Sequence, residues 1–156
     1  HDADFPVWTG VHLEEAPGVE KIDIKTVLAA LDLGLESEKT LAWAANFAAA
    51  VNARLVVCHV TLSIEGRSGE YFDPDWREHL AAEAAAEIKK LLEKVPAEPE
   101  ILIESGDTPK VVCSVAERLG ADVLVIGRGS AAGVFGRLRA NAYSIIRQSP
   151  CPVVSV

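Results

Sequence analysis

Two patterns of apolar residues alternate along the chain. Short, nearly continuous runs of β-branched and other apolar residues predict buried strands, and segments with helical spacing follow them. The predicted strands are 22–33, 54–60, 100–105, 122–127 and 151–156. The predicted helices are 36–52, 76–95, 106–121 and 140–148. Strand–helix units repeated in this way predict an α/β fold, in which an open five-stranded parallel sheet carries helices on both faces.

The first 21 residues precede this pattern, so we expect an N-terminal strand and linker followed by one domain over 22–156. The segment "FPVWTG" (5–10) resembles the end of the chain, "CPVVSV" (151–156), at its Pro-Val core. We expect these two segments to pair antiparallel, within one chain or between dimer mates. Pairing would cover Trp8 and a sheet edge that is otherwise open. A disordered tail is the alternative.

Composition narrows the class of protein. A chain of 156 residues can bury a core as one domain. It contains no apolar run near the roughly 18 residues of a membrane span, so we expect no membrane partner. Its three cysteines, Cys58, Cys113 and Cys151, show no metal-binding spacing and predict reduced thiols in a cytoplasmic protein. A net charge of −8 argues against a nucleic-acid partner.

The charge is distributed unevenly. Residues 123–156 contain four arginines and no acidic residue, so this segment carries a charge of +4. Because the net charge of the whole chain is −8, the first 122 residues carry −12. Three of these arginines, Arg128, Arg137 and Arg139, lie among the glycines that follow the strand 122–127. A basic segment on an acidic chain is suited to a small anion such as a phosphate. Chance, combined with arginines that favour helix ends, is the alternative.

Candidate binding residues follow the predicted strands. In an open parallel sheet, ligands bind beyond the carboxyl ends of the strands, where the winding reverses. Asp32, the His59–Val60 pair and the loop that starts at Gly127 occupy such ends. Each has a structural alternative: a turn-forming aspartate, a histidine with a local hydrogen bond, and a plain connecting loop. The sequence shows no catalytic triad, carboxylate pair or metal cluster, so we expect no enzyme activity beyond a very weak ATPase.

Four segments of the chain resemble one known family when they are taken in order. They are "VLAALDLGLESEKTLAWA", "ARLVVCHV", "GDTPKVVCSVAERLGADVLVIGRG" and "IIRQSPCPVVSV". Together they resemble the universal stress proteins from about Lys25 to Val156. The resemblance implies an adenine-nucleotide α-hydrolase-like domain with strand order 3-2-1-4-5, a stress-response regulatory or signalling role, and homodimers through the last strand. In one branch of the family it also implies bound ATP, with magnesium.

The resemblance extends to individual residues of the ATP site. Asp32 matches the aspartate that contacts the nucleotide, Val60 matches a backbone contact on the second strand, and Gly127 matches the first glycine of the phosphate loop. Gly129 matches the second glycine of the loop. A single residue separates it from Gly127 in this chain, whereas the family pattern has two residues there. We expect Arg128 to contribute to a positive rim for the phosphates.

Further along the loop the chain departs from that pattern. Arg139-Ala140 stands where the branch has glycine followed by serine or threonine. The arginine can itself bind a phosphate, and Ser130 can supply the missing hydroxyl. The sequence therefore predicts an adenine-nucleotide site at the crevice between the first and fourth strands of the domain. A ligand-free structural or regulatory dimer with a vestigial loop is the alternative. Some members of the family fuse two domains in tandem. Residues 5–10 resemble the last strand of such a domain, so they also look like the end of a preceding domain.

Overall fold

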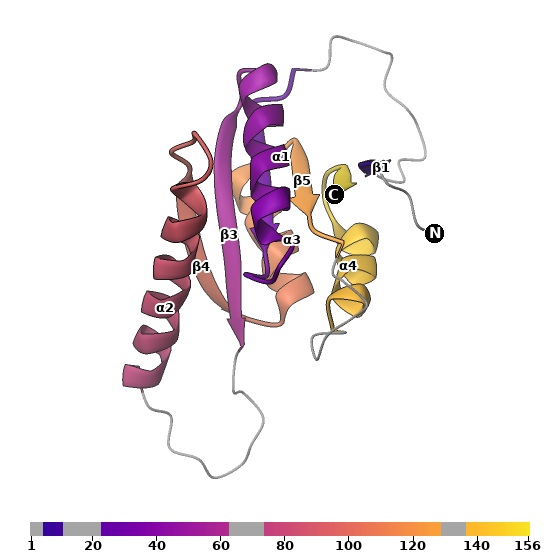
Figure 1. Cartoon of the computed structure of the whole chain (residues 1–156). Coiled ribbons are helices and arrows are strands. Elements are labelled where there is room, and N and C mark those ends of the chain that lie inside the picture. The colour runs from indigo at the N-terminus through magenta and orange to yellow at the C-terminus, as the bar shows by residue number, and fades with distance from the viewer. Residues whose placement is uncertain (1–4, 11–22, 63–73, 129–136) are drawn as a thin grey trace.

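The computed structural model describes residues 5–10, 23–62, 74–128 and 137–156 (Figure 1). The strands are β1 (Val7–Thr9), β2 (Thr26–Leu31), β3 (Arg54–Leu62), β4 (Glu100–Gly106), β5 (Val123–Ile126) and β6 (Val153–Ser155). The helices are α1 (Ser37–Ala50), α2 (Pro74–Leu92), α3 (Thr108–Leu119) and α4 (Arg137–Gln148). The predicted elements are therefore present. Most strands are shorter than the predicted apolar runs, and α4 begins three residues earlier than predicted.

The strands form one sheet in the order β1-β6-β5-β2-β3-β4. Neighbours among β2 to β6 are parallel, so the domain has the predicted order 3-2-1-4-5. Strand β1 adds an antiparallel edge. The predicted α/β class and winding are confirmed.

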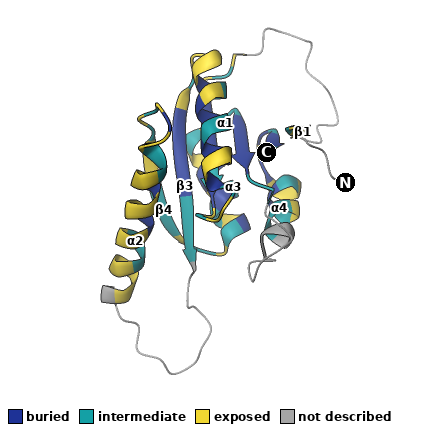
Figure 2. Ribbon diagram, in the orientation of Figure 1, coloured by how far each residue is buried: buried dark blue, intermediate teal, exposed yellow. Residues whose placement is uncertain are grey.

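Two apolar clusters cover the two faces of the sheet. Val27, Ala29 and Leu31 of β2 pack in the cluster that includes Leu41 of α1 and Ile88 of α2. Residues of the other parity in β2 and its neighbours pack in the cluster formed with α3 and α4. Figure 1 shows α1 in front of the sheet with α3 behind it, and Figure 2 shows that the central strands are buried. The central strands, covered on both faces, therefore hold their carboxyl ends in fixed positions.

The N-terminal strand pairs with the last strand of the same chain. Val7 lies opposite Ser155, Trp8 opposite Val154 and Thr9 opposite Val153. The predicted antiparallel pairing of residues 5–10 with 151–156 is confirmed, and it occurs within one chain.

The amino ends of the central strands are joined by one carboxylate. Oδ2 of Asp122, just before β5, accepts hydrogen bonds from the backbone N–H of Lys25 at 2.8 Å and of Thr26 at 2.9 Å. The backbone N–H of Asp122 donates to Thr26 O, and that of Arg54 donates to Lys25 O. These bonds fix the register of β2 against both of its neighbours at the amino end.

Candidate functional site

The winding of the sheet reverses between β2 and β5. The chain passes from β2 to β3 and β4 on one side, and then returns to β5 on the other side of β2. Ala30 is level with Ile126 across this pair. Asp32 and Gly127 therefore lie at the carboxyl ends of the two strands, where ligands bind in open parallel sheets.

Asp32 holds the turn between β2 and α1. Its Oδ1 accepts hydrogen bonds from the backbone N–H of Gly34 at 3.0 Å and from the hydroxyl of Ser37 at 2.8 Å. Ser37 is buried in the first turn of α1, so the bond fixes the aspartate against the body of the domain. Asp32 therefore has the turn-forming role that the sequence analysis named as an alternative to ligand binding. Oδ2 of the same carboxylate accepts no hydrogen bond from the described residues, and Asp32 is exposed.

Gly127 allows helix α1 to approach the end of β5. A Cβ atom at this position would lie 2.9 Å from Oγ1 of Thr40. Thr40 is 1% exposed, and its hydroxyl donates to the carbonyl of Glu36 at 3.0 Å. The glycine predicted for phosphate binding thus has a packing role as well. The sequence singled out Gly127 as a glycine after a strand, but it gave no indication that Thr40 would be its packing partner.

His59 and Val60 lie at the end of β3. Nδ1 of His59 lies 2.9 Å from the carbonyl oxygen of Leu31, its register partner on β2. The sequence analysis offered such a local hydrogen bond as the alternative to a ligand-binding role for His59, and the structure contains it. Val60 is partly buried and packs against the cluster on the α3 and α4 face, so only its backbone is suited to contact a ligand.

Arg128 binds the end of β6 and the N-terminal segment. Its Nε donates to Oγ of Ser155 at 3.3 Å, and its terminal nitrogen donates to the carbonyl of Ser155 at 3.1 Å and to that of Phe5. Its backbone N–H continues the pairing by donating to Val156 O. These contacts turn the guanidinium toward β6, and the predicted phosphate contact of Arg128 stays a prediction.

The remaining predicted site residues are not placed in detail. Gly129 and Ser130 lie outside the described residues. Arg139 and Ala140 belong to the first turn of α4, where the described side chains begin only at Asn141.

The three cysteines, Cys58, Cys113 and Cys151, are free thiols, and Cys58 and Cys151 are buried. Burial raises the pKa of Cys58 to about 12, with a further contribution from the charge of Glu104. Burial also raises the pKa values of Cys113 and Cys151. Thiols with raised pKa values are poor nucleophiles at neutral pH. Among the described residues, no group of three or more metal-binding side chains occurs, and no helix is long and apolar enough to cross a membrane.

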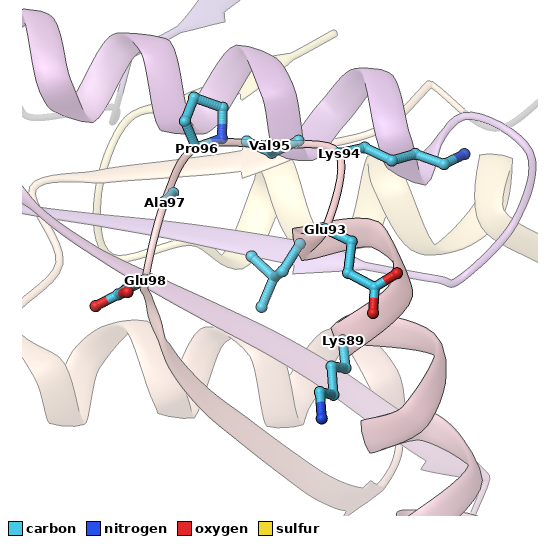
Figure 3. Close-up of a pocket in the computed structure, with 8 residues that line it drawn as sticks. Lys89, Glu93, Lys94, Val95, Pro96, Ala97 and Glu98 are labelled. Atoms are coloured by element: carbon cyan, nitrogen blue, oxygen red, sulfur yellow. The ribbon is translucent and has the colours of Figure 1, made fainter.

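A shallow hollow of about 830 Å³ lies at the other end of the sheet, between the end of α2 and the start of β4 (Figure 3). Its lining consists of Lys89, Leu92, Glu93, Lys94, Val95, Pro96, Ala97 and Glu98. Lys94 and Glu98 point away from each other in Figure 3, and Lys94 forms an ion pair with Glu38 at 2.6 Å. The charged groups of this hollow do not converge on one point, so we place the candidate site at the carboxyl ends of β2 and β5.

The fold and this crevice define a class: open parallel α/β domains with a candidate ligand site at the point where the winding reverses. The model of the universal stress protein family matches residues 23–156. Universal stress protein A homolog 1 of Coxiella burnetii is 32% identical over 138 residues, which cover 85% of this chain and 95% of that protein. The chain belongs to the universal stress protein family.

Solved structures of the family share this fold. A universal stress protein in complex with cAMP is 23% identical and has a TM-score of 0.59, with 86% of this chain and 98% of that chain covered. A universal stress protein from Archaeoglobus fulgidus DSM 4304 is 24% identical with a TM-score of 0.61. That match covers 99% of this chain and 50% of that chain. At these identities the likeness establishes the fold.

Proposed function

We propose that the chain binds ATP or a related adenine nucleotide at the crevice between β2 and β5, and acts as a regulatory or signalling module in a stress response. The observation that carries this proposal is the arrangement of Asp32. One carboxylate oxygen is held by Gly34 and Ser37, and the other accepts no hydrogen bond from the described residues. A carboxylate fixed in this way is suited to accept hydrogen bonds from ribose hydroxyls.

Three further features support the proposal. Gly127 brings backbone without a side chain to the carboxyl end of β5, the strand that neighbours β2. The basic segment from residue 123 onward offsets phosphate charge. A family member of the same fold has been solved with cAMP. Mg²⁺ is commonly bound through substrate phosphates, so magnesium would arrive with the phosphates of ATP.

The proposal includes three statements about the working protein. We propose no catalysis beyond very slow ATP hydrolysis, because the sequence offers no catalytic triad or carboxylate pair. We propose a cytoplasmic location, which the unpaired thiols support. A homodimer through the last strand would form only when residues 7–9 have left the β6 edge that they occupy here.

The substitution Asp32→Asn tests the site with little disturbance of the turn. The asparagine oxygen can still accept from Gly34 and Ser37, while its amide nitrogen replaces the second acceptor by a donor. We expect the affinity for ATP, measured by isothermal titration calorimetry with magnesium, to fall about ten-fold or more, the value of a hydrogen bond to a charged group. Asp23→Asn, an exposed aspartate at the amino end of the sheet, is the matched control and should bind as the parent does.

Two outcomes would contradict the proposal in different ways. Equal binding by the parent and by Asp32→Asn would place the nucleotide elsewhere. A parent chain that shows no binding, and no thermal shift where ATP at 100 times its dissociation constant would add about 2.7 kcal/mol, would favour the ligand-free alternative. The contacts of Arg128 favour that alternative, since they direct one predicted phosphate partner toward Ser155 and Phe5.

A further inference from the structure

Arg128 lies between the candidate crevice and the N-terminal segment, residues 5–10. It follows Gly127 at the carboxyl end of β5, and its backbone N–H donates to Val156 O at 3.0 Å. This bond holds the backbone of Arg128 beside the end of the chain. The long side chain can still adopt other rotamers, so its guanidinium can reach more than one set of acceptors.

In the structure, the guanidinium joins the end of β6 to the N-terminal segment. It donates to the hydroxyl and the carbonyl of Ser155, and it also donates to the carbonyl of Phe5, which lies 123 residues away in the sequence. Phe5 is 68% exposed, so the hydrogen bond to its carbonyl is a main part of what holds this residue.

A second contact holds the same segment without involving Arg128. The ring of Trp8 on β1 meets that of Phe47 on α1 edge-on, with a centroid separation of 5.4 Å. Trp8 is 48% exposed, so its ring can be removed without opening the core. Such a change weakens the docking of residues 5–10 and leaves the guanidinium itself unaltered.

A phosphate is a better partner for this arginine than the acceptors named above. Those acceptors are neutral oxygens, two carbonyls and one hydroxyl. A phosphate carries the opposite charge and accepts two parallel hydrogen bonds from a guanidinium, which makes the contact stronger. Phosphates that are bound beside Gly127 would therefore draw the guanidinium away from Ser155 and Phe5.

We propose that Arg128 couples the N-terminal segment to the nucleotide crevice. Without nucleotide its guanidinium holds Phe5, and with ATP bound the same guanidinium binds the phosphates and releases Phe5. Docking of the segment and binding of the phosphates therefore weaken each other by the same factor, as linked equilibria require. This coupling rests on the proposed nucleotide site, and it does not apply to adenosine, which has no phosphate.

Isothermal titration calorimetry of the full-length chain, with ATP plus magnesium and with adenosine, tests the coupling. In Trp8→Ala, we expect the affinity for ATP to rise about two- to ten-fold, because the loss of one aromatic contact weakens docking of the segment by that factor. The affinity for adenosine should equal that of the parent. Phe5→Ala is the matched control, since it keeps the main-chain carbonyl and should bind ATP as the parent does.

The variant Arg128→Gln removes the group that the two partners share. In this background Trp8→Ala should leave the affinity for ATP unchanged, and the double-mutant cycle then gives the coupling. The carbonyl ¹³C signal of Phe5 in NMR spectra is a direct readout, because its position depends on the hydrogen bond from Arg128. ATP should move this signal in the parent, whereas adenosine should not, and neither ligand should move it in Arg128→Gln.

Failure of the coupling is distinguishable from failure of the nucleotide site. If the parent binds ATP and Asp32→Asn binds it less well, while Trp8→Ala binds it as the parent does, the site stands and the coupling is wrong. An equal gain for ATP and adenosine in Trp8→Ala would show that the segment obstructs the whole crevice. The same gain for ATP in the Arg128→Gln background would show that the competition does not pass through Arg128. A parent chain that binds neither ligand would refute both proposals.

Discussion

Replacement of Gly127 by alanine tests how closely helix α1 packs against the end of β5. The backbone of Gly127 is outside the left-handed region, so an alanine fits its conformation, and the effect of the change comes from the new methyl group. That methyl would lie 2.9 Å from Oγ1 of Thr40, which is closer than real Cβ atoms approach other heavy atoms. Thr40 is held in the helix and 1% exposed, so it cannot turn away into solvent.

The expected cost follows from this overlap. Extra methyl groups in packed interiors typically destabilise by about 1–3 kcal/mol. For a chain of this size, about 1 kcal/mol corresponds to about 2–4 °C in the melting temperature. We therefore expect Gly127→Ala to lower the melting temperature by about 2–12 °C. Gly10→Ala, where no atom lies within 4 Å of the added methyl, should change the stability by less than about 0.5 kcal/mol.

A double-mutant cycle assigns the cost to Thr40. Thr40→Ala removes the hydroxyl that the new methyl meets, so in that background Gly127→Ala should be close to neutral. The coupling free energy between the two sites should then lie in the range of about 0.5–3 kcal/mol found for residues in contact. Urea unfolding, followed by circular dichroism, measures all four chains. An equal cost of Gly127→Ala in both backgrounds would refute the packing argument.

Two other predictions concern a helix end and a buried thiol. Gly120 ends α3 in the left-handed conformation, with φ of 58°, so Gly120→Ala should cost about 1 kcal/mol, visible as a melting temperature lowered by about 2–4 °C. Cys58 is neutral in the folded chain up to about pH 12, while the unfolded thiol ionises from about pH 9. Its contribution to stability is therefore complete below pH 9 and is lost as the pH rises toward 12. Calorimetry at pH 8 and pH 10.5 should show a smaller alkaline loss for Cys58→Val than for the parent, and parallel losses would contradict this linkage.

The order of strands and helices was predictable because the pattern of buried residues dictates it. β2 and β5 are covered on both faces, and such strands have continuous apolar runs that are easily recognised. The pairing of β1 with β6 was predictable for a related reason, since an exposed Trp8 and an open edge both favour cover. Whether β1 would come from the same chain was left open by the sequence, because the pattern is the same in both cases.

The directions of individual side chains were less predictable. Arg128 stands beside glycines in a basic segment, which favours a phosphate contact, yet its guanidinium binds Ser155 and Phe5. These partners lie far away in the sequence and offer two main-chain carbonyls and one serine hydroxyl, for which no sequence pattern exists. The contact between Gly127 and Thr40 was hidden for a similar reason, because it depends on the distance between a helix and a strand end. The two roles of Asp32 are compatible, since each involves a different oxygen.

The hydrogen bonds of Asp122 have a consequence for how this domain can change over time. They fix the register of β2 at the amino end, whereas the candidate site lies at the opposite end. Substitutions in the crevice therefore leave the alignment of the strands intact, and a new ligand preference can arise while the same scaffold is retained. A substitution of Asp122 would instead change the affinity for every ligand in the same way, because it would shift the strands that carry all of the binding residues.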